Sequence, residues 1–158
     1  MINKAEKYCW FMTPYLIITD EMTHALCLAA KRGVDVRIIT PGIPDKKFIY
    51  NVTRSFYHGL VKHGVRGYEW TPGFCHAKMS VADDCMATCG TINLDYRSLY
   101  HHFENGCFMA DCQAVVEIKN DLIRTMGECR DVTDQYQTGR SAYLRLGQLF
   151  MRLFAGLL

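Results

Sequence analysis

Six residues between Phe74 and Glu104 have the types and the spacing for chemistry on a phosphate group. They follow the pattern H-x-K, four residues, D, six residues, G-T-x-N, and they are His76, Lys78, Asp83, Gly90, Thr91 and Asn93. Residues two apart in a strand point to the same face, so His76 and Lys78 would share one space. The imidazole could attack phosphorus or pass a proton, while the ammonium balances the charge of the phosphoryl oxygens.

A second short strand, Met86–Cys89, is predicted after a turn at Asp83 and Asp84. It would return the chain and bring a backbone donor, a hydroxyl and a carboxamide to the His76 end of the sheet. These groups include no carboxylate cluster, so we expect an anion site that needs no metal and no organic cofactor. The plainer alternative, a buried histidine and a surface lysine on an ordinary strand, explains a lone H-x-K better than six residues at fixed spacing.

The pattern resembles the H-K-D motif of the phospholipase D superfamily. The longer run G-T-I-N-L-D-Y-R-S at residues 90–98, followed by F-E at 103–104, is similar to the second motif of bacterial cardiolipin synthases. About residues 5–130 resemble the C-terminal half of such an enzyme, including the runs Y-C-W-F-M-T-P-Y-L and Y-E-W-T-P-G-F-C-H. One departure, Ile17-Ile18-Thr19 in place of a shorter segment, affects one loop near the site.

The resemblance assigns roles to individual residues. The catalytic set it implies is His76, Lys78 and Asp83, and the phosphate-binding set is Lys78, Asn93 and Thr91. In the family, Asp83 would mainly brace the site. Glu104 would hold His76 in one tautomer by accepting its second ring proton. Its alternative is a solvated carboxylate at a strand edge. His58, His63, His101 and His102 are expected to be polar residues without a catalytic role.

The function implied by the resemblance is phosphatidyl transfer. A phosphatidyl group would pass through a phosphohistidine to the hydroxyl of a second phosphatidylglycerol, giving cardiolipin and glycerol. His76 would be the nucleophile or the general acid/base. Such enzymes pair two H-K-D motifs and this chain has one, so the second would come from the rest of a longer chain or from a homodimer. A dimeric phosphodiesterase or nuclease, and a catalytically silent membrane-associated half-domain, remain alternatives.

Composition agrees with one globular α/β domain. The chain has 158 residues and a formal charge of +2, and its basic residues form no stripe, which argues against a nucleic-acid partner. None of the eight cysteines is spaced as C-x-x-C, so we expect small buried residues in a reducing compartment rather than metal ligands. The start M-I-N-K-A-E-K predicts no signal peptide, and no run is long enough to span a membrane.

The hydrophobic pattern predicts an alternation of strands and helices. The expected strands are Tyr8–Thr13, Val34–Thr40, Val65–Trp70, one carrying His76 and Lys78, Met86–Cys89 and Glu104–Ala110. The expected helices are Glu21–Arg32 after an Asp20 cap, a helix from an Asp45 cap through Lys62, and Asp111–Cys129. This order indicates a phospholipase D-like half-domain: a mixed sheet flanked by helices.

The last residues are expected to form a separate unit. A domain at 1–130 would be followed by a tail at 131–158, in which Tyr143–Leu158 reads as a cationic amphipathic helix. This helix would lie on an anionic phospholipid surface, or its apolar stripe would pack on the domain. With phosphatidylglycerol as substrate, the expected location is the cytoplasmic side of a bacterial membrane, as a peripheral protein.

Overall fold

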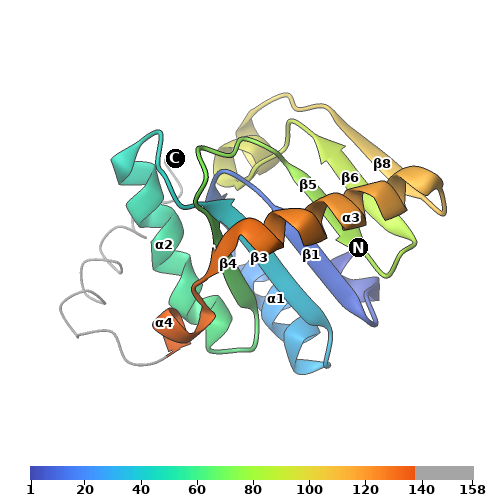
Figure 1. The fold of residues 1–158 in the computed structure, drawn as a ribbon, viewed down its shortest axis with the longest axis horizontal. Helices are drawn as coiled ribbons and strands as arrows, with labels where there is room; N and C mark the ends of the chain where they lie inside the picture. Colours follow the sequence, from blue (N-terminus) through green and yellow to red (C-terminus); the bar gives the residue numbers. More distant parts are fainter. Residues whose placement is uncertain (138–158) are drawn as a thin grey trace.

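The computed structural model describes residues 1–137, which form one mixed β-sheet with helices on both faces (Figure 1). The sheet has seven strands in the order β8-β6-β5-β1-β3-β4-β9. Their bounds are β1 Tyr8–Met12, β3 Asp35–Pro41, β4 Arg66–Trp70, β5 Met79–Ala82, β6 Met86–Gly90, β8 Gly106–Ala110 and β9 Cys129–Asp131. The predicted fold class, a mixed α/β sheet flanked by helices, is confirmed.

Two kinds of connection produce this order. β1, β3 and β4 are parallel, and they are joined through α1 (Asp20–Lys31) and α2 (Lys47–Val61). β5, β6 and β8 run antiparallel to their neighbours, and β9 closes the opposite edge antiparallel to β4. A small parallel sheet pairs β2 (Leu16–Ile17) with β7 (Leu94–Asp95), which ties the chain after β6 to the chain after β1.

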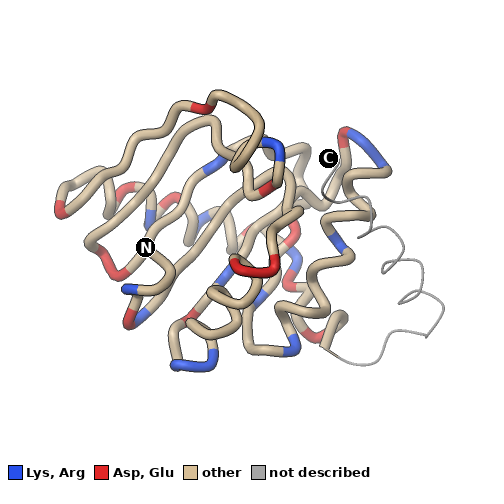
Figure 2. The backbone as a smooth tube through the Cα atoms, turned by 180° about the vertical axis from the view of Figure 1, so that it is seen from behind, with Lys and Arg blue, Asp and Glu red and all other residues tan. Residues whose placement is uncertain are grey.

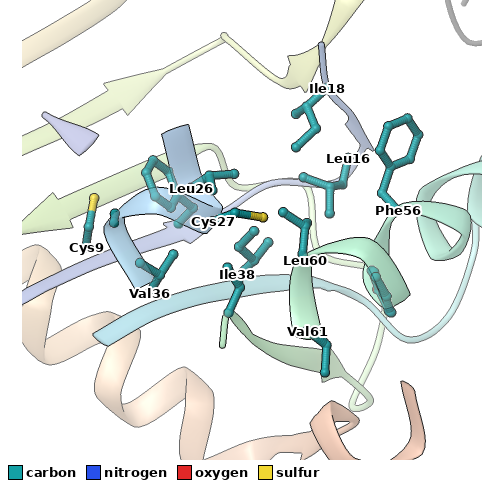
Figure 3. Close-up of a cluster of buried hydrophobic side chains, with 14 of the residues drawn as sticks. Cys9, Leu16, Ile18, Leu26, Cys27, Val36, Ile38, Phe56, Leu60 and Val61 are labelled. Carbon is teal, nitrogen blue, oxygen red and sulfur yellow. The ribbon is translucent and has the colours of Figure 1, made fainter. Parts of the chain in front are cut away.

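The core lies in two layers, one on each face of the sheet. α1 and α2 cover one face, where Leu26 and Leu60 pack on Val36 and Ile38 of β3 (Figure 3). α3 (Gln113–Glu128) crosses the other face, as Figure 1 shows. β1 is therefore buried along its whole length, and its alternate side chains enter opposite layers.

The helix starts differ from those predicted. The N-cap of α1 is Thr19, whose hydroxyl accepts the Met22 N–H at 3.2 Å, and Asp20 is the first helical residue. Asp45 caps no helix: its carboxylate accepts the Lys46 N–H and the Tyr15 hydroxyl, and α2 begins two residues later. The sequence locates the start of a helix to within one or two residues, and the hydrogen bonds determine which residue is the N-cap.

α3 presents a narrower apolar stripe than expected. Val115, Leu122 and Met126 are buried against the sheet, and Ile118 is partly buried there. Ile123 was predicted to face inward but is 45% exposed. At 100° per residue, Ile123 lies about a quarter-turn around the helix from the buried Leu122. A helix that packs on a sheet buries only one side of its circumference, so Ile123 remains exposed.

The packed unit extends beyond residue 130. Val132 and Tyr136 are fully buried, and α4 (Thr133–Gln137) contacts α2. The rings of Tyr136 and Tyr57 meet edge to face at 4.8 Å. The boundary expected after residue 130 therefore falls inside the packed unit. The predicted amphipathic helix at 143–158 lies outside the described residues, and among residues 1–137 no helix is long and apolar enough to cross a membrane.

Candidate active site

His76 and Lys78 lie in the segment that leads into β5, not in the strand itself. Residues 74–78 have no regular secondary structure, and β5 begins at Met79. The two side chains nevertheless meet, as their spacing predicts. Nζ of Lys78 is 2.9 Å from Nδ1 and 3.0 Å from Nε2 of the His76 ring, and it donates to the His76 carbonyl at 2.7 Å. The strand prediction was wrong, but an imidazole and an ammonium share one space.

Gly90 places the end of β6 beside this pair. Its N–H donates to the Lys78 carbonyl at 3.2 Å. A Cβ at this position would lie 2.3 Å from the Asn105 carbonyl oxygen and 2.6 Å from Cα of Gly106. Because both of these atoms belong to the backbone, only glycine allows β6 and β8 to come so close here. The close approach fixes the position of the residues that follow, Thr91 and Asn93.

Thr91 and Glu104 bind each other. The Thr91 hydroxyl donates to the Glu104 carboxylate and accepts the Asn105 N–H at 2.9 Å. Hydrogen bonds from Thr91, and next from Ser98, hold the pKa of Glu104 below its usual range. The structure thus places Glu104 against Thr91, and against His102 at 3.9 Å, whereas the His76 ring has Lys78 as its described hydrogen-bond partner. The Thr91 hydroxyl is occupied by protein rather than turned to a ligand.

Asn93 has an unused hydrogen-bonding group. Its Oδ1 is buried and has no partner among the described residues. A buried polar atom without a partner costs about 1–3 kcal/mol, so a native structure normally gives it one. Rotating the carboxamide by 180° would offer Nδ2 at the same place. Asn93 is also one of the residues that line the adjoining cavity, so its carboxamide is a candidate partner for a molecule bound there.

These residues line one cavity, the phosphate cavity, of about 400 Å³. Its wall is made by His76, Ala77, Lys78, Met79, Cys89, Gly90, Thr91 and Asn93. Among these described residues, Lys78 is the one lysine or arginine, and none has a carboxylate. Partial burial lowers the pKa of Lys78, and the nearby Glu104 opposes that shift. A cation, an imidazole and an unpaired amide without acidic groups suit an anionic ligand.

Asp83 is not part of this cavity. It follows β5, at the opposite end of that strand from Lys78. Its carboxylate accepts three backbone N–H groups, from Glu6 at 2.7 Å, Lys7 at 2.9 Å and Tyr8 at 2.8 Å. Partial burial would raise the pKa of this carboxyl, but the three N–H bonds hold it below its usual range. Among the residues named as catalytic from sequence, Asp83 thus has a bracing position only.

Asp83→Asn should lower the free energy of unfolding by about 1–2 kcal/mol, because an amide cannot replace an anion that accepts three N–H groups. Asn tolerates the left-handed backbone at φ 53°, so the substitution tests the charge alone. The folded pKa is lowered, so the difference is present above the unfolded value and disappears as pH falls through the folded one. Urea unfolding across pH measures it.

The control for this prediction is Asp111→Asn. Asp111 is exposed, also has a positive φ of 48°, and its carboxylate has no hydrogen bond in residues 1–137. This variant should stay within about 0.5 kcal/mol of the parent. Equal losses at both positions would show that the left-handed backbone, and not the three N–H bonds, accounts for the effect.

Two other histidines make structural contacts, and most of the cysteines are not buried as predicted. His58 Nδ1 lies 2.8 Å from the Tyr136 carbonyl and His63 Nδ1 lies 2.7 Å from the Gly59 carbonyl, which are structural contacts. The prediction of buried cysteines was wrong for most of them. Of the eight, Cys9 and Cys27 are buried, and Cys89, Cys107 and Cys112 are exposed; Cys107 lies on the edge strand β8, and Cys89 lies on its neighbour β6.

Two residues of the site were not identified from sequence. Asp95 is buried and accepts the Ser98 N–H at 2.7 Å, which starts the π-helical turn η2 (Arg97–His101). Ser98 also helps to hold Glu104. The signal was the aspartate itself, because an aspartate at the start of a helical turn commonly accepts a backbone N–H from two or three residues on. Within residues 1–137, no group of three His, Cys, Asp or Glu side chains is placed to hold a metal ion.

Comparison with known proteins identifies the family. The family model described as "Cardiolipin synthase, PLD-like domain" matches residues 1–126. The cardiolipin synthase of Halalkalibacterium halodurans is 34% identical over 158 residues, which are all of this chain and 31% of that protein. The chain thus spans about a third of the length of this relative.

Solved structures confirm the fold. The phospholipase D family member Nuc of Salmonella typhimurium has a TM-score of 0.71 at 18% identity, over 82% of this chain and 84% of Nuc. The phosphatidylserine synthase of Haemophilus influenzae Rd KW20 has a TM-score of 0.67 at 20% identity, over 98% of this chain and 40% of that one. With a family model that matches four fifths of its length, this chain belongs to the PLD-like domain family of cardiolipin synthases.

Proposed function

We propose that this chain supplies one half of an active site for phosphatidyl transfer between two phosphatidylglycerol molecules. The observation that carries the proposal is the phosphate cavity, where Lys78 meets His76 and the Asn93 carboxamide oxygen has no partner among the described residues. A phosphodiester anion would pair with the ammonium, and with the Asn93 carboxamide when its nitrogen is turned to donate, and it would leave the imidazole for chemistry at phosphorus. The family membership and the cardiolipin synthase relatives support the lipid substrate.

The reaction needs a second histidine. In the first step, one imidazole attacks phosphorus and the bond from phosphorus to the oxygen of the headgroup glycerol breaks. The other histidine gives that oxygen a proton, and free glycerol leaves. In the second step, this other histidine removes a proton from a hydroxyl of the next phosphatidylglycerol. The resulting oxygen attacks phosphorus and breaks the phosphorus–nitrogen bond, which gives cardiolipin. His76 takes one of these two roles, and a second H-x-K motif supplies the other.

The surface around the site supports a missing partner. Ile92, Tyr100, Phe103 and Phe108 are all large, apolar and exposed, and Phe103 is completely so. They lie in the segment between β6 and the end of β8 that also carries Thr91 and Glu104. Exposed apolar groups near a site usually mark an interface. We place the second motif there, from the rest of a longer chain or from a second copy, at the cytoplasmic side of a membrane.

A single-motif phosphodiesterase that cuts nucleic acid is the second candidate, because most of the Nuc chain is matched by this one. The distribution of charge argues against this candidate. Figure 2 shows basic and acidic residues interspersed along the described chain rather than gathered into a basic stripe. Nucleic-acid binding draws most of its affinity from such clustered cations.

Reconstitution tests the proposal. The chain alone, and the chain joined to the N-terminal two thirds of the H. halodurans synthase, are added to phosphatidylglycerol vesicles and to DNA. Cardiolipin and glycerol formed in equal amounts by the joined protein support phosphatidyl transfer. DNA cleavage by a dimer of the chain would support the phosphodiesterase instead. A joined protein that is folded but inert would make the chain a catalytically silent half-domain.

Lys78→Ala should slow the joined enzyme by about 3 kcal/mol of barrier, roughly 150-fold, because a preorganised charge at the phosphoryl oxygens is lost. Since the pKa of Lys78 is lowered, its charge also disappears at lower pH than that of an exposed lysine. The parent should therefore lose rate on the alkaline side, and Lys78→Arg should shift this loss to higher pH. Initial rates across pH measure both effects, and Lys62→Ala, at an exposed position, is the control.

Turnover should survive chelators. His76, Lys78 and Asn93 are a poor set of ligands for a hard divalent cation, which prefers several carboxylate oxygens. We expect unchanged initial rates of the joined enzyme in excess EDTA. Activity that disappears with EDTA and returns with one added metal would contradict the proposed chemistry.

A further inference from the structure

A second and larger cavity, the apolar cavity, lies beside the phosphate cavity. It has a volume of about 580 Å³, within the range of ligand pockets in proteins. Met22 and Ala25 of α1 form one side of it, and Ile92 and Leu94, after β6, form another. Ser80 and Thr88 also line it, and their hydroxyls bond to each other at 2.6 Å. These polar groups are therefore satisfied without a ligand.

The two cavities adjoin each other. Lys78, Met79, Cys89 and Gly90 line both of them. A ligand with an anionic group at Lys78 would therefore have the apolar cavity directly beside that group. Among the described residues, Lys78 and Glu21 are the lining residues with charged side chains, and most of the other lining side chains are uncharged and apolar.

The lining also suits a ligand of variable shape. Four of the residues are methionines, among them Met22 and Met79, and methionine adapts its flexible side chain to irregular ligands. A cation at one end and an apolar surface along the rest match the two ends of one phospholipid.

We propose that the apolar cavity binds an acyl chain of the phospholipid whose phosphate lies at Lys78. This inference rests on the proposed function, and it adds a site for the tail of the lipid to the site for its headgroup. A phospholipid that leaves a bilayer exposes its acyl chains to water, which is unfavourable. A cavity that covers one acyl chain offsets much of this cost. Binding should then tighten up to about fourfold for each methylene that enters the cavity.

The test uses three soluble probes with one headgroup: glycerophosphoglycerol, dibutanoyl and dihexanoyl phosphatidylglycerol, all below micelle formation. Methyl-labelled methionines report the position of binding by NMR. We expect the acylated probes to shift Met22, and to leave Met126, under α3 on the opposite face of the sheet, unchanged. We also expect the dissociation constant to fall from glycerophosphoglycerol to the dihexanoyl probe.

Two variants fill or polarise the cavity. Ala25→Trp should remove the dependence on chain length and leave glycerophosphoglycerol binding as in the parent. Met22→Glu places a charge in the partly exposed wall and should have the same effect if Ala25→Trp folds poorly. His24→Trp, one residue away, exposed and outside the cavity lining, is the matched control and should bind all three probes like the parent.

The outcomes separate this inference from the proposed function. Affinity that is independent of chain length, or a chain-length dependence that survives both variants, would overturn the acyl site. The proposed function would still stand if Lys78→Ala weakened binding of glycerophosphoglycerol. If Lys78→Ala had no effect on that probe, the headgroup site itself would fail. Variants that change only the self-association of the chain in sedimentation would make the cavity a protein contact and also overturn the inference.

Discussion

His76→Ala should abolish cardiolipin formation by the joined, two-motif enzyme. Loss of a general acid or base alone typically lowers a rate by about 10²–10⁴-fold, and loss of the nucleophile removes the covalent route altogether. No other imidazole of this chain lines the phosphate cavity, and the Lys78 amine that contacts His76 is already engaged with it. Release of glycerol and formation of cardiolipin, followed by mass spectrometry, measure the loss.

The same variant distinguishes the two roles of His76. If His76 is the nucleophile, radiolabelled phosphatidylglycerol should no longer label the enzyme. If it is the general acid/base, the label should appear on the histidine of the other motif and persist, because nothing activates the second alcohol. His101→Ala, an exposed histidine outside the phosphate cavity, is the control and should retain parental turnover. Parental turnover in His76→Ala would remove this residue from the mechanism.

The fold was predictable because its hydrophobic pattern is local. β1 is apolar at every position since both its faces are covered, and α1 is set between an N-cap and Gly33, whose positive φ ends the helix. Errors occurred where a single element could not reveal its neighbours. Ile123 has the apolar character of a core residue, but only the width of the contact between α3 and the sheet decides that it is exposed.

The sequence predicted which residues form the site better than it predicted which of them touch one another. Gly90 had to be glycine because the backbone of Asn105 and Gly106, where β8 begins, would lie 2.3 and 2.6 Å from a Cβ, a fact that no local pattern contains. Thr91 and Glu104 are thirteen residues apart and meet only because β6 and β8 pair. Asp83 belongs to the motif, yet its three bonds to residues 6–8 hold the hairpin to the start of β1, far along β5 from Lys78. A motif thus records residues that act together without saying which of them touch the substrate.

The largest loss of stability should follow from Glu69→Ala. Glu69 is completely buried on β4, where its carboxylate binds Arg54 of α2 at 2.8 and 3.1 Å and also Arg130 of β9. Removing one partner of a fully buried ion pair usually costs about 3–5 kcal/mol, and we expect a loss near the lower end of this range because Arg54 and Arg130 are 23% and 54% exposed and water compensates them in part. Urea unfolding should show a lower midpoint with an unchanged slope, since the same surface is exposed on unfolding.

A surface pair of the same chemistry is the control. Asp121 and Arg124 of α3 form an ion pair at 3.0 Å, with side chains 47% and 76% exposed. Asp121→Ala should change the unfolding free energy by less than about 1 kcal/mol, because solvent screens such pairs. A similarly small loss in Glu69→Ala would mean that the two arginines find water when the carboxylate is absent. β4, α2 and β9 would then be held together by their apolar contacts alone, and the core around Tyr136 would not depend on this charge.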